Sequence, residues 1–162
     1  NLLGAVLLLS STMTFLGCST VDDGSYTAPI TLTEKIGGKW VVNSVTQTDE
    51  TNARTKTLTN LLDFDTFVIN LNQDEAGNAT TFSVQGNAPA LLPTSGTWKM
   101  DYNFTKSDNT ASNLILNDGK AETSLTVTAV PGNTKTLEYR LTRKTNGQSF
   151  VSYTYNLTQA VK

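Results

Sequence analysis

The stretch that decides the fold is TLEYRLTRKTNGQSFVSYTYNLT, residues 136–158. Two runs in it, Thr136–Arg143 and Phe150–Thr158, alternate apolar and polar side chains, which is typical of β-strands with one buried and one solvated face. Asn146-Gly147 between them favours a tight turn, because both residue types tolerate the positive φ that a two-residue hairpin requires. The sequence therefore predicts an antiparallel hairpin close to the C-terminal end of the chain.

The same alternation continues towards the N-terminus, in short runs separated by turn residues. Six further strands are expected, over Lys39–Gln47, Thr66–Asn72, Ala79–Gln85, Thr97–Tyr102, Ser112–Asn117 and Thr123–Val130. About eight antiparallel strands joined mainly by hairpins predict an all-β, up-and-down meander that closes into a barrel, which removes its edge strands. A two-sheet sandwich is the competing architecture. Thr51–Leu62 is the one segment whose pattern favours a helical turn or a short helix.

The N-terminal end has the features of a secretory signal. Leu2–Leu9 is an apolar run, and it is followed by small residues and then by Phe15-Leu16-Gly17-Cys18. This last run resembles a bacterial lipobox, in which the signal is cut before the cysteine and the thiol is lipidated. A membrane-spanning helix is the alternative, but it needs roughly 20 apolar residues. We therefore expect residues 1–17 to be a lipoprotein signal peptide whose own start is missing, and Cys18 to carry the lipid.

Residues 18–36 are polar and show no periodicity, so we expect a flexible tether between the lipidated cysteine and the domain. Asp22-Asp23 within it has two interpretations. The pair is either part of a solvated linker or a sorting signal, since acidic residues just after the cysteine resemble the surface-export signals of Bacteroidetes lipoproteins.

Composition excludes several classes of function. The chain has 162 residues and a net charge of −2, with Lys and Arg scattered singly, so nothing indicates a nucleic-acid partner. It has no histidine, which removes the commonest general base and the commonest transition-metal ligand. Residues 37–162 are a suitable length for one domain.

Three motifs carry a resemblance to a known family. Gly37-Gly38-Lys39-Trp40 resembles the Gly-x-Trp opening of lipocalin-like domains, in which the tryptophan plugs one end of the barrel. Together with Asp63–Leu71 and Gly96–Asp101, spaced over residues 37–158, it is similar to lipocalin-like lipoproteins of Bacteroidetes that form a domain-of-unknown-function family (DUF5004-like). The resemblance implies a lipocalin-like β-barrel and an envelope location, and it brings no established activity.

No catalytic residues are predicted, because a Ser-His-Asp or Cys-His arrangement needs a histidine. Asp63 and Asp65 would point to the same side of an extended chain, as acid–base pairs do, but Asp also favours turns and strand starts. Asp74, Glu75 and Asn78 carry oxygen ligands of the kind that Ca²⁺ takes, but a solvated hairpin tip is the expected structure. We therefore expect no enzyme activity, no cofactor and no metal.

Tyr139, Tyr153 and Tyr155 fall on strand faces that otherwise carry Leu and Val. They are either packed core residues or polar groups in an apolar cavity that binds a small molecule. Loop residues 86–95 carry Leu91 and Leu92 between two prolines, and they are either an exposed barrel lid or partner contact, or buried across the barrel mouth.

From these observations we expect an outer-membrane lipoprotein, anchored through lipid on Cys18 and facing the periplasm or the cell surface. Its barrel would bind a small apolar or amphipathic molecule or a glycan, without catalysis, through Tyr139, Tyr153 and Tyr155. The alternative is a cell-envelope scaffold or protein-interaction module with a filled barrel and an envelope protein as its partner. The two hypotheses differ in whether the barrel interior holds a cavity.

Overall fold

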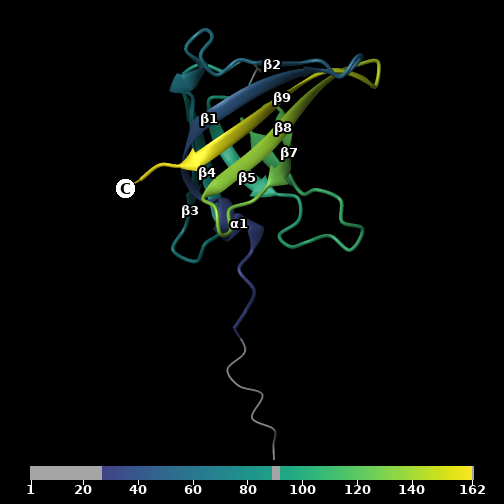
Figure 1. Ribbon diagram of the computed structural model, residues 1–162. Helices are drawn as coiled ribbons and strands as arrows, with labels where there is room; N and C mark the ends of the chain where they lie inside the picture. Colours follow the sequence, from purple (N-terminus) through teal and green to yellow (C-terminus); the bar gives the residue numbers. More distant parts are fainter. Residues whose placement is uncertain (1–26, 89–91, 162) are drawn as a thin grey trace, which may run out of the picture.

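One antiparallel sheet closes on itself to form the domain (Figure 1). The computed structural model describes residues 27–88 and 92–161. Within these residues the strand order is β2-β1-β3-β4-β5-β6-β7-β8-β9, and a further pairing of β1 with β9 closes the ring. The predicted all-β, up-and-down barrel is therefore confirmed, with eight strands in the barrel and β2 as one extra strand. The single sheet with its first and last barrel strands paired excludes the two-sheet sandwich.

The element bounds follow the alternation in the sequence closely. In chain order the elements are the helix α1 (Leu32–Ile36), β1 (Gly38–Asp49), β2 (Thr55–Thr57), the 3-10 helix η1 (Phe64–Thr66), β3 (Val68–Gln73), β4 (Ala79–Gln85), β5 (Ser95–Met100), β6 (Asn113–Asn117), β7 (Glu122–Ala129), β8 (Thr136–Thr145) and β9 (Gln148–Gln159). No helix among the described residues is long and apolar enough to cross a membrane.

The helix expected within Thr51–Leu62 is wrong. Thr55–Thr57 forms β2, which pairs with β1 through Thr46↔Thr57 and Thr48↔Thr55. β-Branched side chains favour the extended backbone, and here the cross-strand threonine pairs outweigh a weak helical pattern. Leu58 then turns into the core, where its side chain is 7% exposed, and its N–H donates to the Val45 carbonyl at 2.8 Å.

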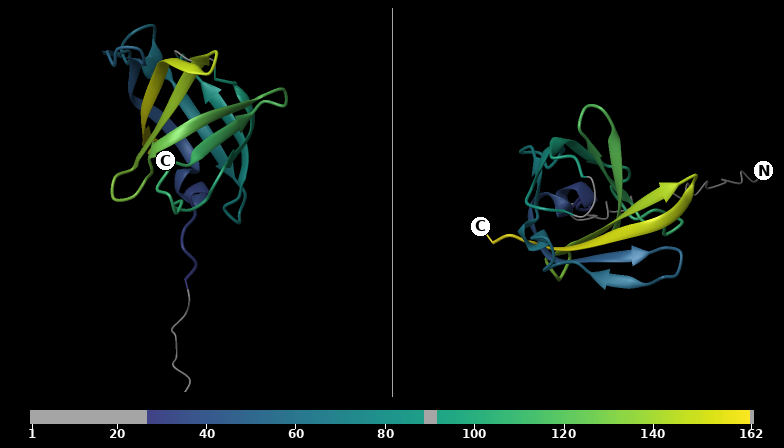
Figure 2. Two further views of the ribbon diagram at one scale, coloured as in Figure 1. Left: turned by 90° about the vertical axis from the view of Figure 1, so that its right-hand side faces the viewer. Right: turned by 90° about the horizontal axis from the view of Figure 1, so that it is seen from above.

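The tether prediction needs correction for residues 32–36, because these residues form α1 and pack against the barrel. Thr31 and Glu34 make a capping box, in which each side chain accepts a hydrogen bond from the backbone N–H of the other residue. Ile36 is fully buried, and its carbonyl accepts a 2.7 Å hydrogen bond from the Trp40 Nε1. Seen from above, α1 lies within the outline of the barrel (Figure 2). The folded domain therefore begins before residue 37, and α1 with Trp40 closes one end of it.

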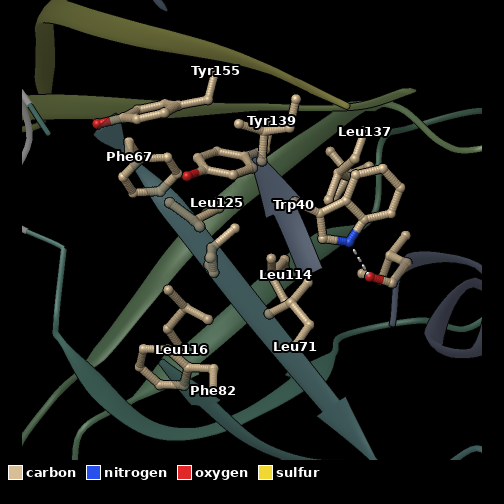
Figure 3. Close-up of a cluster of buried hydrophobic side chains, with 14 of the residues drawn as sticks. Trp40, Phe67, Leu71, Phe82, Leu114, Leu116, Leu125, Leu137, Tyr139 and Tyr155 are labelled. Carbon is tan, nitrogen blue, oxygen red and sulfur yellow. Dashed lines mark hydrogen bonds between the residues drawn. The ribbon is translucent and has the colours of Figure 1, made fainter. Parts of the chain in front are cut away.

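Inward-facing side chains from every barrel strand fill the interior (Figure 3). The fully buried large residues are Trp40, Tyr139, Tyr155, Phe67, Phe82, Ile36, Ile69, Leu71, Leu114, Leu116, Leu125 and Leu137. Burial of this many apolar side chains is the dominant favourable contribution to folding.

Candidate functional site

Because successive strands run in opposite directions, the connections between them lie alternately at the two ends of the barrel (Figures 1 and 2). The start of β1, the β3–β4 and β7–β8 turns and the β5–β6 loop lie at the end closed by α1. The segments between β2 and β3, β4 and β5, and β8 and β9 lie at the opposite end. We call the latter the far end.

A hollow of about 360 Å³, lined by both apolar and polar groups, opens at the far end. It is lined by Leu62, Phe64, Val84, Gly86, Asn87, Ala88, Leu92 and Thr94. Leu92 packs against the core, whereas Leu91 lies outside the described residues. The Leu62 side chain is 78% exposed at its rim, where solvent contact gives an apolar group no stabilisation.

The backbone at this rim is strained. Leu62 and Asp63 both have left-handed conformations, with φ of 53° and 58°. Each left-handed residue other than glycine costs roughly 1–2 kcal/mol, so neighbouring contacts must hold the pair in place. Asn87 does so, because its Nδ2 donates to the Leu62 carbonyl at 3.0 Å, while the Thr66 Oγ1 donates to the Asp63 carbonyl at 2.6 Å.

Close approach of two chain segments completes the rim. The Asn87 N–H donates to the Thr66 Oγ1 at 3.1 Å, which brings the β4–β5 segment against η1. Gly86 has a φ of 75°, and a Cβ placed on it would lie 2.1 Å from the Thr66 carbonyl oxygen. Only glycine fits this position, so the rim has a defined geometry with Leu62 projecting from it.

The tyrosines predicted to bind a ligand lie beneath this end, and two of them are core residues. Tyr139 and Tyr155 are fully buried and stack with ring centroids 4.8 Å apart. The Phe67 ring packs against the Tyr155 ring, with centroids 5.1 Å apart (Figure 3). Tyr153 is half-buried and packs against the edge of the same cluster. A ligand-binding role for these three residues stays a prediction.

The interior around the stacked tyrosines is occupied by side chains. Tyr139, Tyr153 and Tyr155 line none of five hollows on the surface of the described residues. The Tyr139 hydroxyl is nevertheless buried with no hydrogen-bond partner among the described residues. Burial raises the pKa of this hydroxyl well above its ordinary value of 10.0, so it is neutral at physiological pH.

The carboxylate pairs considered in the sequence belong to turns. Asp63 and Asp65 do not share one side of an extended chain, because Asp63 precedes η1 and Asp65 lies inside it. Asp74 accepts hydrogen bonds from the backbone N–H groups of Ala76 and Asn78 and from the Asn78 side chain, which lower the pKa of its carboxyl. Asp74 therefore closes the β3–β4 turn. The described residues contain no group of three or more His, Cys, Asp or Glu side chains that could hold a metal ion.

The structure also contains a polar cluster on the outer barrel face that was not predicted from the sequence. Glu50 accepts hydrogen bonds from the Ser152 hydroxyl and from the Arg140 guanidinium, and the Arg140 Nε donates to the Ser152 Oγ at 2.9 Å. The Ser152 hydrogen bond and the neighbouring guanidinium lower the pKa of the Glu50 carboxyl. Ser152, expected on a solvated face, is fully buried beneath this pair. Only one indication of this cluster was visible in the sequence, which was that polar residues occupy the outward positions of β8 and β9.

Comparison with known proteins identifies a family for this chain. The family model described as "Domain of unknown function (DUF5004)" matches residues 14–158. Searches of curated proteins and of solved structures give no match. The match runs from before α1 to Thr158 in β9, and it also includes Cys18, which lies outside the described residues.

Proposed function

The chain belongs to the DUF5004 family of unknown function, and we propose that it is a non-catalytic, lipid-anchored barrel of the bacterial outer membrane that binds an envelope protein through its far end. The observation that carries this proposal is the exposed Leu62 side chain on the wall of the far-end hollow. A strained rim that exposes a leucine is costly to the free protein, and such strain is typical of functional sites.

The packed interior supports recognition at the surface. Tyr139, Tyr155 and Phe67 occupy the space that a small ligand would need in a lipocalin-like barrel. A protein partner that covered Leu62 and filled the hollow would bury apolar surface at both, which is the usual source of affinity at an interface.

The position of the N-terminal segment supports an anchor on the other side of the barrel. The described chain enters at the α1 end, where the Leu32 N–H donates to the Asn103 carbonyl at 2.8 Å. A lipid on Cys18 would therefore attach the protein by the α1 end and leave the far end turned away from the bilayer. Changing Cys18→Ser should release the protein from the membrane fraction, and retention of a processed protein there would contradict the anchor.

Photo-cross-linking in cells tests the partner site. A photoreactive residue at Thr94, on the wall of the hollow, should give a discrete protein adduct. The adduct should be lost in Leu62→Asn, because asparagine tolerates the left-handed backbone and removes only the apolar side chain. Leu61→Asn is the matched control, since Leu61 is 42% exposed and does not line the hollow. No adduct, or equal adducts in both variants, would contradict the proposal.

A small ligand in the barrel is a second candidate, favoured by the buried Tyr139 hydroxyl without a partner. Such a group is stabilised when a polar atom reaches it. Native mass spectrometry after incubation with envelope lipids and glycans should show a discrete bound mass if this candidate is correct, and Tyr153→Ala at the edge of the cluster should weaken it. A bare domain mass under gentle conditions would contradict it.

A further inference from the structure

We propose that the α1 end of the barrel is a membrane-contact surface, in which Tyr102 and Phe104 seat the domain on the interface of a phospholipid bilayer. The inference rests on the proposed lipid anchor at Cys18 and goes beyond it, because an anchor alone does not bring the folded domain against the lipid. It assigns a defined orientation to the barrel, with the α1 end down and the far end up.

Exposed apolar side chains occur on three separate segments at the α1 end. They are Ile30 (64% exposed), Tyr102 (48%), Phe104 (46%) and Val130 (38%). These residues come from the chain before α1, the β5–β6 loop and the β7–β8 turn. Tyr102 has an apolar ring with a polar hydroxyl, which is the kind of side chain that favours the membrane–water interface, while Phe104 and the apolar residues beside it add buried area.

The two aromatic residues are held in place by the loop that carries them. Asn103, which lies between them, accepts the Leu32 N–H at its carbonyl, and its Oδ1 accepts hydrogen bonds from the Thr33 N–H at 3.3 Å and from the Thr33 hydroxyl. Asp101 just before them accepts from the Asn113 N–H at 2.7 Å and from the Lys106 Nζ at 3.1 Å. The loop is therefore tied to α1 and β6, and the exposure of Tyr102 and Phe104 does not result from a loose chain end.

The length of chain between the anchor and the barrel allows the contact. Nine peptide steps separate Cys18 from Thr27, the first described residue, and a chain spans at most about 3.6 Å per residue. Even when fully extended, this segment keeps Thr27 within roughly 32 Å of the lipidated residue. The segment is therefore short enough to keep the α1 end within reach of the bilayer surface.

Charge indicates which kind of membrane surface fits. The α1 end carries Lys35, Lys39 and Lys135 and also the acids Glu34, Asp74 and Glu75, while Lys106 is already paired with Asp101. This end is not a basic patch, so attraction to anionic lipid would contribute little. We expect the contact to form on zwitterionic phosphatidylcholine and to persist in high salt, since it depends on apolar and aromatic burial.

Quenching by brominated lipid tests the orientation directly. The lipidated full-length protein would be placed on phosphatidylcholine vesicles with bromine atoms on the upper acyl chain, carrying either Phe104→Trp or Phe150→Trp. Phe150 is 39% exposed at the far end and is the matched control, while the native Trp40 and Trp98 are buried. We expect a marked loss of the added emission for Phe104→Trp and no loss for Phe150→Trp, unchanged in 1 M salt.

Three results would overturn the inference. Equal quenching at both positions would mean that the barrel has no fixed orientation, and no quenching at either would mean that the anchor holds it away from the lipid. Either result leaves the anchor itself intact. Protein that fails to bind the vesicles would instead contradict the anchor, and with it the contact. As a second check, Tyr102→Ser with Phe104→Ser should leave the protein vesicle-bound but abolish quenching of a tryptophan at Val130.

Discussion

The two ends of the barrel differ in how the chain covers the core. At the α1 end, a capped helix covers the opening and the Trp40 indole donates to its last carbonyl, so regular hydrogen bonds close the core. At the far end, the left-handed residues Leu62 and Asp63 are held by hydrogen bonds from Asn87 and Thr66, and the Leu62 side chain is left exposed. The difference indicates that closure of the barrel does not require strain. The strain at the far end therefore needs another explanation, and the partner site proposed there is one.

The strongest test of this comparison is removal of the plug at the α1 end. Trp40→Ala should lower the free energy of unfolding by about 3–5 kcal/mol, since it empties a fully buried site and removes the hydrogen bond to Ile36. Urea denaturation measures the change. Trp40→Phe keeps most of the volume and should cost much less. A loss below about 1 kcal/mol for the alanine variant would mean that α1 does not close the core.

The far end should be sensitive to a single methyl group. Gly86→Ala should destabilise the domain by roughly 2–3 kcal/mol, because the new Cβ combines a left-handed backbone with a clash against the Thr66 carbonyl. Gly119→Ala is the matched control, since its φ is also positive at 86° but its Cβ would meet nothing within 4 Å. Equal thermal shifts in the two variants would show that the approach of β4–β5 to η1 is not tight.

The interior between the two ends can be tested by removing one oxygen. Tyr139→Phe should leave stability unchanged or raise it by about 1 kcal/mol, because the buried hydroxyl has no partner among the described residues. Chemical denaturation of the two proteins side by side measures this. Destabilisation would mean that a water or a ligand satisfies the hydroxyl, which would favour the small-ligand candidate.

Changes to the Glu50 cluster on the outer face should have the smallest effect on stability, and this effect depends on pH. The pKa of Glu50 is lowered in the folded state from its ordinary 4.5, so its carboxylate stabilises the fold above pH 4.5 and this contribution is lost as pH falls through the lowered value. Glu50→Gln should therefore flatten the acid side of the stability profile by roughly 1 kcal/mol or less, because Arg140 is partly exposed. An unchanged acid profile would show that the cluster contributes nothing to the native state.

Alternation in the sequence was enough to predict the barrel, but not its ends. All eight barrel strands were predicted because each buries one face, whereas β2 has only three residues, too few for a pattern. The helix α1 is also short, although the Thr31–Glu34 capping box was a visible signal for it. The conformation of Leu62 depends on Asn87, 25 residues away, and the Glu50–Ser152 contact spans 102 residues. Contacts of this kind depend on strand register across the sheet and leave no local signal.

The pairing of β1 with β9 also determines when the domain can fold. Trp40 on the first strand lies opposite Gln159, almost at the end of the chain. During synthesis, the edge of β1 that pairs with β9 therefore has no partner until β9 has been made. Closure of the barrel joins residues that are far apart in the sequence, so it is a slow step. The barrel of a nascent chain can therefore remain open until β9 has been made. A truncation that removes β9 would leave two unpaired strand edges, a direct route to aggregation.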